Sequence, residues 1–324
     1  MRVTPLAVVR SEEFIRNGFA ESVEYLWEVP NTTLWTPLRV TVRLVRALAW
    51  TFGAYFLSLM ASTAGLFSPT LAKRWTEAVS RGWVNRMPAM LGMCMTVIGR
   101  RPEKPFFLVF NHISWLDPVA MNALCDARTV VMAPMVTMPV MGRLWRALDA
   151  IPTRRIAEDT PACLAEMMAT LRRGDNLLMA PEGIISPGQE VKRYRPRLLE
   201  AATRCNFPVH YASLTYRTPK GCPSAADRVL FGPDPHYPWP DGKIPEAEFE
   251  GWGKQRTFLG HVIRLIALPY FEIVVRFGPE PVQGKHPVQL ASALQQATTD
   301  LFVPLQGQPA KTDPETLIAR AGFG

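Results

Sequence analysis

Cysteine and histidine are scarce in this sequence, which has five of each among 324 residues. The cysteines have neither the paired spacing of a zinc site nor the clustering of a disulfide framework. They stand at Cys94, Cys125, Cys163, Cys205 and Cys222. Their pattern argues against a cysteine-based metal centre and a disulfide scaffold, and it fits reduced thiols on the cytoplasmic side. We expect no metal and no bound cofactor.

Acidic residues are outnumbered, with 28 Asp and Glu against 36 Lys and Arg, which gives a net charge of +8. Such a balance favours an anionic partner, which can be a membrane surface, a phosphate-bearing substrate or a nucleic acid. The aromatic residues are not interleaved with the basic ones, and no motif resembles a nucleic-acid-binding module. We therefore expect membrane lipids as partners and no nucleic acid.

Charge is absent from one long segment, since no residue from 47 to 72 is ionisable as Asp, Glu, Lys or Arg. About 20 apolar residues suffice to span a bilayer, and Arg39, Arg43, Arg46, Lys73 and Arg74 flank this segment. The pattern fits a transmembrane span, a helix immersed in one leaflet or a buried core helix. With a second helical pattern at 75–95, it predicts a membrane-associated helical pair at 37–95. Residues 1–36 form an N-terminal extension that does not resemble a signal peptide.

Short apolar runs predict the strands of a sheet at 96–98, 106–110, 129–135, 177–180, 207–214 and 272–277. Helical patterns at 160–173 and 287–302 complete an α/β domain over 96–303. Seven prolines between 218 and 250 exclude a central strand or a long helix there. We interpret this segment as an insertion that serves as a lid, a binding loop or a linker, and 304–324 as a C-terminal tail.

Two polar motifs directly follow predicted strands. After 106–110 comes Asn-His-Ile-Ser-Trp-Leu-Asp, residues 111–117, in which Asp117 before Pro118 is typical of a helix N-cap. A turn can fold His112 back onto Asp117, and a carboxylate-bound imidazole is a general base for an alcohol. After 177–180 comes Pro-Glu-Gly, residues 181–183, where Gly183 lets a backbone approach a ligand beside Glu182. The alternative is a purely structural role, in which Asp117 only caps a helix and His112 is a core residue.

These motifs, in this order, resemble those of the glycerolipid acyltransferases, and the nearest type is the 1-acylglycerol-3-phosphate (lysophospholipid) acyltransferases. The resemblance extends over residues 85–303 and includes two further blocks, 142–155 and 207–214. It implies a mixed central sheet flanked by helices. It also implies transfer of an acyl group from acyl-CoA or acyl carrier protein to a lysolipid hydroxyl, with His112 as the base and Asp117 orienting it.

The resemblance also suggests which residues bind substrate. Arg155, with Arg154 beside it, matches the arginine that holds the acceptor phosphate. Glu182 is expected to position the acceptor, and Asn111 or backbone amides near Gly183 to stabilise the oxyanion.

In one place the sequence departs from the family, because Ile184 and Ile185, followed by Ser186, stand where Thr and Arg are usual. Arg195 or its basic neighbours are candidates for the missing phosphate contact. The resemblance favours 1-acylglycerol 3-phosphate as the acceptor, which would give phosphatidic acid as the product. A lyso-aminolipid, another lysophospholipid and a non-catalytic lipid-binding protein stay open as alternatives, and the oligomeric state is also open.

Overall fold

An eight-stranded mixed sheet forms the centre of the protein, as seen in a computed structural model that describes residues 8–9, 35–154, 160–230 and 258–305. The strand order is β1-β2-β8-β7-β3-β6-β4-β5, and β7 and β8 form the antiparallel pair. The strands are β1 (Val8–Val9), β2 (Met93–Ile98), β3 (Phe107–Phe110), β4 (Arg128–Met132), β5 (Ile151–Thr153), β6 (Leu177–Met179), β7 (Val209–Arg217) and β8 (Phe271–Phe277). The predicted mixed α/β fold is confirmed.

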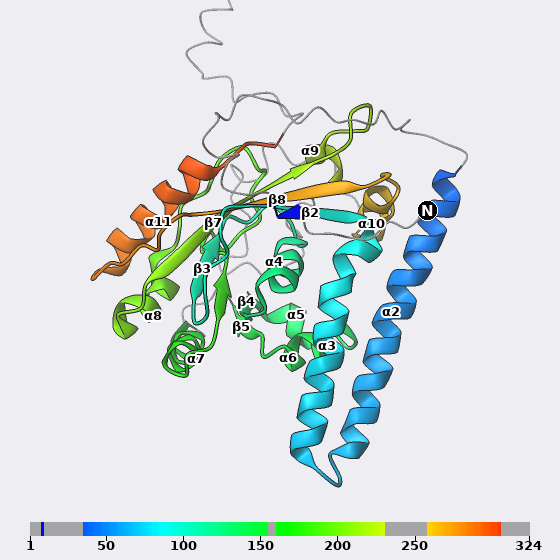
Figure 1. The fold of residues 1–324 in the computed structure, drawn as a ribbon, viewed down its shortest axis with the longest axis horizontal. Helices are drawn as coiled ribbons and strands as arrows, with labels where there is room; N and C mark the ends of the chain where they lie inside the picture. The colour runs from blue at the N-terminus through cyan, green and yellow to red at the C-terminus, as the bar shows by residue number, and fades with distance from the viewer. Residues whose placement is uncertain (1–7, 10–34, 155–159, 231–257, 306–324) are drawn as a thin grey trace, which may run out of the picture.

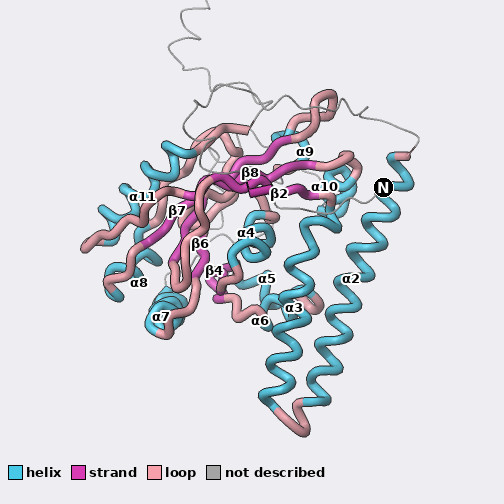
Figure 2. Tube along the Cα trace, viewed as in Figure 1, coloured by secondary structure: helices cyan, strands magenta, loops and turns pink. Residues whose placement is uncertain are grey.

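Helices cover both faces of this sheet, as Figure 1 shows and as the colouring of Figure 2 separates. One side carries α7 (Thr160–Arg172), α8 (Pro196–Cys205) and α11 (Pro287–Leu301). The other side carries α2 (Thr36–Ala64), α3 (Pro69–Leu91), α4 (Asp117–Cys125), α5 (Ala133–Thr137), α6 (Met141–Ala147) and α10 (Phe258–Ile266), and the short α9 (Ala225–Arg228) follows β7. The helices thus form two layers with the sheet between them.

The core has two halves because β3 is buried on both faces. Phe107 and Val109 point into the half covered by α7, α8 and α11, whereas Leu108 and Phe110 point into the other half. Successive side chains of an extended strand point to opposite faces, which explains this alternation. All four residues are at most 1% exposed. A continuous apolar run therefore marks a central strand, as in parallel sheets generally.

Five parallel strands, β7, β3, β6, β4 and β5, end at the same edge of the sheet. His112 follows the end of β3, Glu182 follows β6 and Arg154 follows β5. The carboxyl ends of parallel strands are the usual place for ligand sites in α/β proteins. The sheet thus brings together motifs that are about 70 residues apart in the sequence.

Helices α2 and α3 form a hairpin that extends beyond the rest of the molecule (Figure 1). Polar contacts attach one side of α2 to the body of the protein. Arg43 donates hydrogen bonds to the carbonyl oxygens of Ile266, Leu268 and Pro269 at 3.0, 2.5 and 2.5 Å, just after α10. Further along α2, Arg143 of α6 donates to the Ser58 hydroxyl at 2.7 Å. The helix is therefore held at both ends of its length.

The other side of α2 is apolar and exposed. Its large exposed side chains are Leu38, Val42, Val45, Leu48, Phe52, Phe56, Leu57, Leu59 and Met60. Most of them recur every three or four residues, which places them on one face of a helix. The helical segment 36–63 is long and apolar enough to cross a membrane, and only 17% of its most apolar 18-residue stretch is buried. The buried-core-helix alternative for this segment is therefore wrong.

Several predicted boundaries need correction. The second helix ends at Leu91, because Gly92 adopts a left-handed φ of 82° that closes it, and Met93 already belongs to β2. The predicted strand 129–135 stops at Met132, because the short helix α5 begins at Ala133, and Pro134 in its first turn cannot donate to a strand ladder. The strand predicted at 207–214 runs to Arg217.

The predicted insertion, extension and tail lie mostly outside the described residues. In the insertion, Ala225 and Val229 are at most 2% exposed, so this part belongs to the core. Residues 8–9 of the extension pair with β2 as the strand β1. Leu305, at the start of the tail, donates from its backbone to Gly188 at 2.8 Å.

Candidate active site

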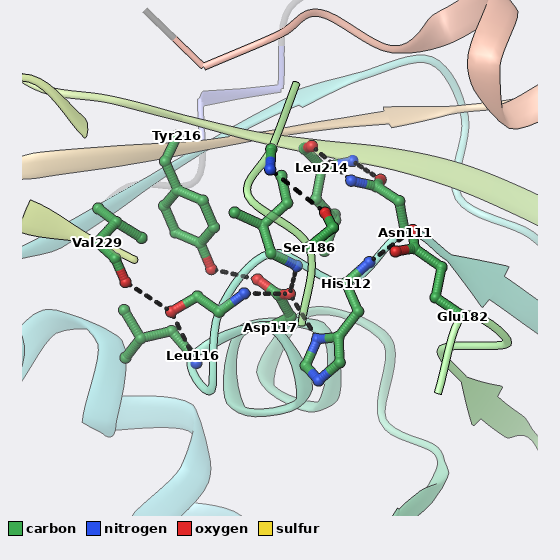
Figure 3. A network of polar contacts seen from close by, with 12 residues as sticks. Asn111, His112, Leu116, Asp117, Glu182, Ser186, Leu214, Tyr216 and Val229 are labelled. Atoms are coloured by element: carbon green, nitrogen blue, oxygen red, sulfur yellow. Dashed lines mark hydrogen bonds and ion pairs between the residues drawn. The ribbon is translucent and has the colours of Figure 1, made fainter. Parts of the chain in front are cut away.

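The turn between β3 and α4 folds His112 onto Asp117, as Figure 3 shows. Nδ1 of His112 lies 2.8 Å from Oδ2 of Asp117, and the same oxygen accepts the backbone N–H groups of Ile113 at 2.6 Å and Ser114 at 2.9 Å. The contact predicted between the two side chains is confirmed. Because an ionised carboxylate only accepts, Nδ1 carries the proton in this contact and Nε2 has a free lone pair.

Asp117 does not cap α4 as predicted. Leu116 occupies the N-cap position, and Asp117 is the first residue of the helix. Its carboxylate points back into the preceding turn, where it binds the N–H groups of residues 113 and 114 instead of those of the helix. The side chain is fully buried. Its position therefore serves the turn and the imidazole.

His112 is the partly exposed member of this pair, with 17% of its side chain accessible. Its Nε2 has no hydrogen-bond partner among the residues that the structure describes. In Figure 3 this nitrogen points away from the polar network. A hydroxyl group that reaches Nε2 meets a neutral imidazole whose opposite side is fixed, which is the geometry of a general base.

Asn111 pairs with the neighbouring strand β7 through its side-chain amide. Its side-chain Nδ2 donates to the carbonyl of Leu214 at 3.1 Å, and its Oδ1 accepts the N–H of Leu214 at 2.6 Å. The side chain thus continues the pairing of β3 with β7 beyond the last residue of β3. One N–H of Nδ2 is left beyond this pair, but Asn111 is fully buried, and its expected role towards an oxyanion stays a prediction.

Glu182 supports the backbone of His112. Its Oε1 accepts the His112 N–H at 3.1 Å, and only 1% of the residue is exposed. Burial, reinforced by the charge of Asp117, raises the pKa of Glu182 well above 4.5, although the His112 amide and the nearby Lys192 oppose this shift. Oε2 has no hydrogen-bond partner within the described residues. The environment favours a neutral carboxyl group beside the backbone of His112.

The turn after Glu182 is built from three predicted site residues. Gly183 has a φ of 71°, which favours glycine, and an added Cβ would lie 3.4 Å from Nε of the exposed Arg195. The backbone N–H of Ser186 donates to the carbonyl of His112 at 2.7 Å, and its side chain is fully buried. The role expected of Ser186 in binding substrate stays a prediction for a buried side chain, whereas Arg195 lies over the turn and is accessible.

Only one residue of the predicted arginine pair is among the described residues. Arg154 directly follows β5 and is exposed at the same sheet edge as His112, whereas Arg155 lies outside the described residues. A separate groove of about 450 Å³ runs between α7 and α8. No predicted site residue lines it. The groove is therefore not part of the candidate site.

Two residues at this site were missed by sequence reasoning. Tyr216 of β7 donates from its hydroxyl to Oδ1 of Asp117 at 2.6 Å. Trp115 donates from Nε1 to Nε2 of His261 in α10 at 3.0 Å, and burial lowers the pKa of that imidazole to about 4. Both contacts join segments about 100 residues or more apart, and no local pattern indicates them.

No metal-binding cluster accompanies the site. In the described ranges, no group of three or more His, Cys, Asp or Glu side chains could hold a metal ion.

Comparison with known proteins agrees with this geometry. Residues 94–214 match the family model described as Acyltransferase. A lyso-ornithine lipid O-acyltransferase of Pseudomonas aeruginosa is 27% identical over 222 residues, which cover 68% of this chain and 77% of that protein. A 1-acyl-sn-glycerol-3-phosphate acyltransferase of Neisseria meningitidis is 28% identical over 123 residues, which cover 37% and 48% of the two chains.

The fold has a counterpart among crystal structures. The 1-acyl-sn-glycerophosphate (LPA) acyltransferase PlsC from Thermotoga maritima aligns with a TM-score of 0.51 at 15% identity, covering 82% of this chain and 96% of that one. Fold, family match and relatives together define an O-acyltransferase. The chain thus carries an Acyltransferase-family domain at residues 94–214, in agreement with the resemblance to the glycerolipid acyltransferases, and the relatives named above are lysolipid acyltransferases. The alternative of a non-catalytic lipid-binding protein is therefore set aside.

Proposed function

We propose that this enzyme transfers a fatty acyl group from a thioester, acyl-CoA or acyl carrier protein, to the free hydroxyl of a lysolipid. One observation carries the proposal. It is the His112 imidazole, with Nδ1 bound to Asp117 and Nε2 unoccupied at the carboxyl edge of the sheet. In this reading Nε2 takes the hydroxyl proton while the hydroxyl oxygen attacks the thioester carbonyl. The C–S bond then breaks, and the thiolate leaves with the proton from the imidazolium.

Direct transfer, without an acyl-enzyme, fits the side chains around the base. The turn between His112 and Asp117 contains Ser114, and the turn after Glu182 contains Ser186; both serines are fully buried. The Ser114 hydroxyl donates to the carbonyl of Val229 at 3.2 Å. Neither serine is placed like a nucleophile beside a base, so the lysolipid hydroxyl itself fills that role.

Because the amide of Asn111 is buried and paired with Leu214, the backbone amides near Gly183 are the better candidates for stabilising the oxyanion. The N–H of Gly183 donates to the carbonyl of Ala180 at 3.3 Å and is also occupied. The next two amides, of Ile184 and Ile185, have no hydrogen-bond partner within the described ranges. We assign oxyanion stabilisation to these backbone amides. Donors that are already fixed in place can stabilise the developing charge without reorganisation.

For the acceptor we favour a lyso-aminolipid of the lyso-ornithine lipid kind over 1-acylglycerol 3-phosphate. The half-buried Ile184 and Ile185 stand where the family usually has Thr and Arg, which removes one phosphate contact. Lys192, one alternative donor, is paired with Glu190 at 2.8 Å. The relatives that match two thirds of this chain carry the name lyso-ornithine lipid O-acyltransferase. 1-Acylglycerol 3-phosphate stays the second candidate, supported by the exposed Arg154 and Arg195.

The enzyme is associated with a membrane, and we propose that its site faces the cytoplasmic side. The exposed apolar side of α2 fits contact with lipid, and the basic residues at its ends fit anionic headgroups. Because the α2–α3 hairpin is fixed to the catalytic body by Arg43 and Arg143, immersion of the hairpin would hold the sheet edge close to its lipid substrates.

Mass spectrometry of the products tests the acceptor. The purified enzyme in phospholipid vesicles is offered lyso-ornithine lipid or 1-acylglycerol 3-phosphate, each with acyl-CoA or acyl carrier protein as donor. We expect the aminolipid to be acylated faster, with little inhibition by inorganic phosphate. Faster acylation of 1-acylglycerol 3-phosphate, with competition by phosphate, would contradict the favoured acceptor and support the second. No product from any pair, at full folding, would contradict the proposed reaction.

A further inference from the structure

The carboxylate behind His112 has a fourth donor that lies outside the matched family segment. Tyr216 belongs to β7, two residues beyond the end of the matched segment at Leu214. Its hydroxyl donates to Oδ1 of Asp117 at 2.6 Å, whereas Oδ2 accepts from His112, Ile113 and Ser114. Figure 3 shows the phenol and the imidazole on opposite sides of this carboxylate.

The length of β7 explains how Tyr216 reaches this position. β3 ends at Phe110, paired with Ala212, whereas β7 continues five residues farther to Arg217. The side chain of Asn111 extends the pairing to Leu214. Because alternate residues of a strand share a face, Leu214 and Tyr216 point the same way, into the half of the core that contains the turn.

We propose that Tyr216 is a positioning residue, which acts through Asp117 to set the basicity and orientation of His112. It does not contact substrate, because only 1% of it is exposed. Burial and the charge of Asp117 raise the pKa of Tyr216 well above its ordinary value, so the phenol keeps its proton and stays a donor. A donor on Oδ1 withdraws charge density from the carboxylate and weakens its attraction for the imidazolium.

Other ionisable groups near the pair come from three elements. Glu182 faces His112 from the turn after β6, and Lys192 faces Glu182 in turn. His261 of α10 accepts from Trp115 in the His112–Asp117 turn. None of these groups contacts Tyr216 in the described part of the chain. A change at Tyr216 therefore reaches His112 through Asp117.

The Tyr216→Phe substitution removes the hydroxyl and keeps the ring that fills the core. Asp117 then pairs more strongly with protonated His112, so more alkaline conditions are needed to free the base. We expect the acid limb of the pH profile of kcat/KM to move up by about 0.5–1 pH unit. We also expect kcat near neutral pH to fall by about 3- to 10-fold, with the KM for lysolipid unchanged.

Tyr194→Phe is the matched control. Tyr194 is also a buried tyrosine, and its hydroxyl donates to Thr298 of α11 at 3.0 Å, with no hydrogen bond to a site residue. Both variants lose one buried hydrogen bond and are expected to lose similar thermal stability. Only Tyr216→Phe is expected to move the acid limb. An unmoved limb in folded Tyr216→Phe, or an equal movement in Tyr194→Phe, would overturn the proposal.

A second replacement covers the case in which Tyr216→Phe does not fold. Site-specific 3-fluorotyrosine at position 216 keeps shape and hydroxyl but makes the phenol a stronger donor. It is expected to move the acid limb in the opposite direction, to lower pH. A limb that stays in place or moves to higher pH would overturn the role of Tyr216. A loss of at least about 100-fold in His112 variants is expected in either case, so this proposal can fail while the proposed function stands.

Discussion

Oε1 of Glu182 accepts the backbone N–H of His112 at 3.1 Å, across 70 residues of sequence. This hydrogen bond joins the turns after β3 and β6, so a nearly inaccessible carboxyl group fixes the backbone from which the proposed base projects. The relationship has a measurable consequence because the pKa of Glu182 is raised by burial.

A raised pKa makes stability depend on pH. The neutral Glu182 carboxyl is favoured in the folded state, so its contribution is complete below the ordinary pKa of 4.5 and is lost as the pH rises through the higher folded-state value. Glu182→Gln imitates the neutral form at every pH. We expect the melting temperature of the variant, relative to that of the wild type, to increase as the pH rises from 4.5 to 8.

Glu103→Gln serves as the control, because 76% of the Glu103 side chain is exposed. It should follow the wild type across the same pH range. If Glu182→Gln also runs parallel to the wild type, the carboxyl group is not held neutral by its surroundings.

Arg43 attaches the hairpin to the catalytic body through three carbonyl oxygens. Replacing it by Met keeps the aliphatic length and leaves these carbonyls without their donor. We expect a loss of about 2–4 kcal/mol in the free energy of unfolding, measured by denaturation in detergent. Arg46→Met, at an exposed position one turn along the same helix, should change it little. Equal effects of the two variants would mean that the clamp contributes no stability.

The exposed side of α2 predicts how the enzyme binds vesicles. Phe52 and Phe56 are 55% and 62% exposed, so their replacement by Ser removes apolar surface without opening a cavity. Each is worth about 1.5–3 kcal/mol when buried in lipid, and the vesicle partition coefficient of the double variant should fall at least about 100-fold. Val288→Ser in α11, where Val288 is 49% exposed, should leave it unchanged. Undiminished binding by the double variant would exclude this face as the lipid contact.

Local sequence signals predicted the central part of the site because its partners are close together in the chain. His112 and Asp117 are five residues apart, so a single turn after an apolar strand brings them together. The strand-end positions of His112 and Glu182 followed from the apolar runs before them. Periodicity also predicted the main helices, although it carried one of them past Gly92 into β2.

Pairing across the sheet could not be predicted in the same way. Asn111 is separated from Leu214 by 103 residues, and Tyr216 from Asp117 by 99. A polar residue beside a catalytic motif has the same sequence signature whether it faces substrate or a neighbouring strand. The role expected of Asn111 was therefore proposed without any sign that its amide pairs with a neighbouring strand. Tyr216 gave no signal because its strand was expected to end at residue 214.

His112→Gln tests the central claim most directly, when measured as the rate of acyl transfer to a lysolipid in vesicles. The account predicts a loss of at least about 100-fold, with circular dichroism, melting temperature and vesicle binding unchanged. His286→Gln, at an exposed histidine before α11, should retain the wild-type rate. A folded His112→Gln enzyme that transfers acyl groups at the rate of His286→Gln would contradict the assignment of His112 as the base.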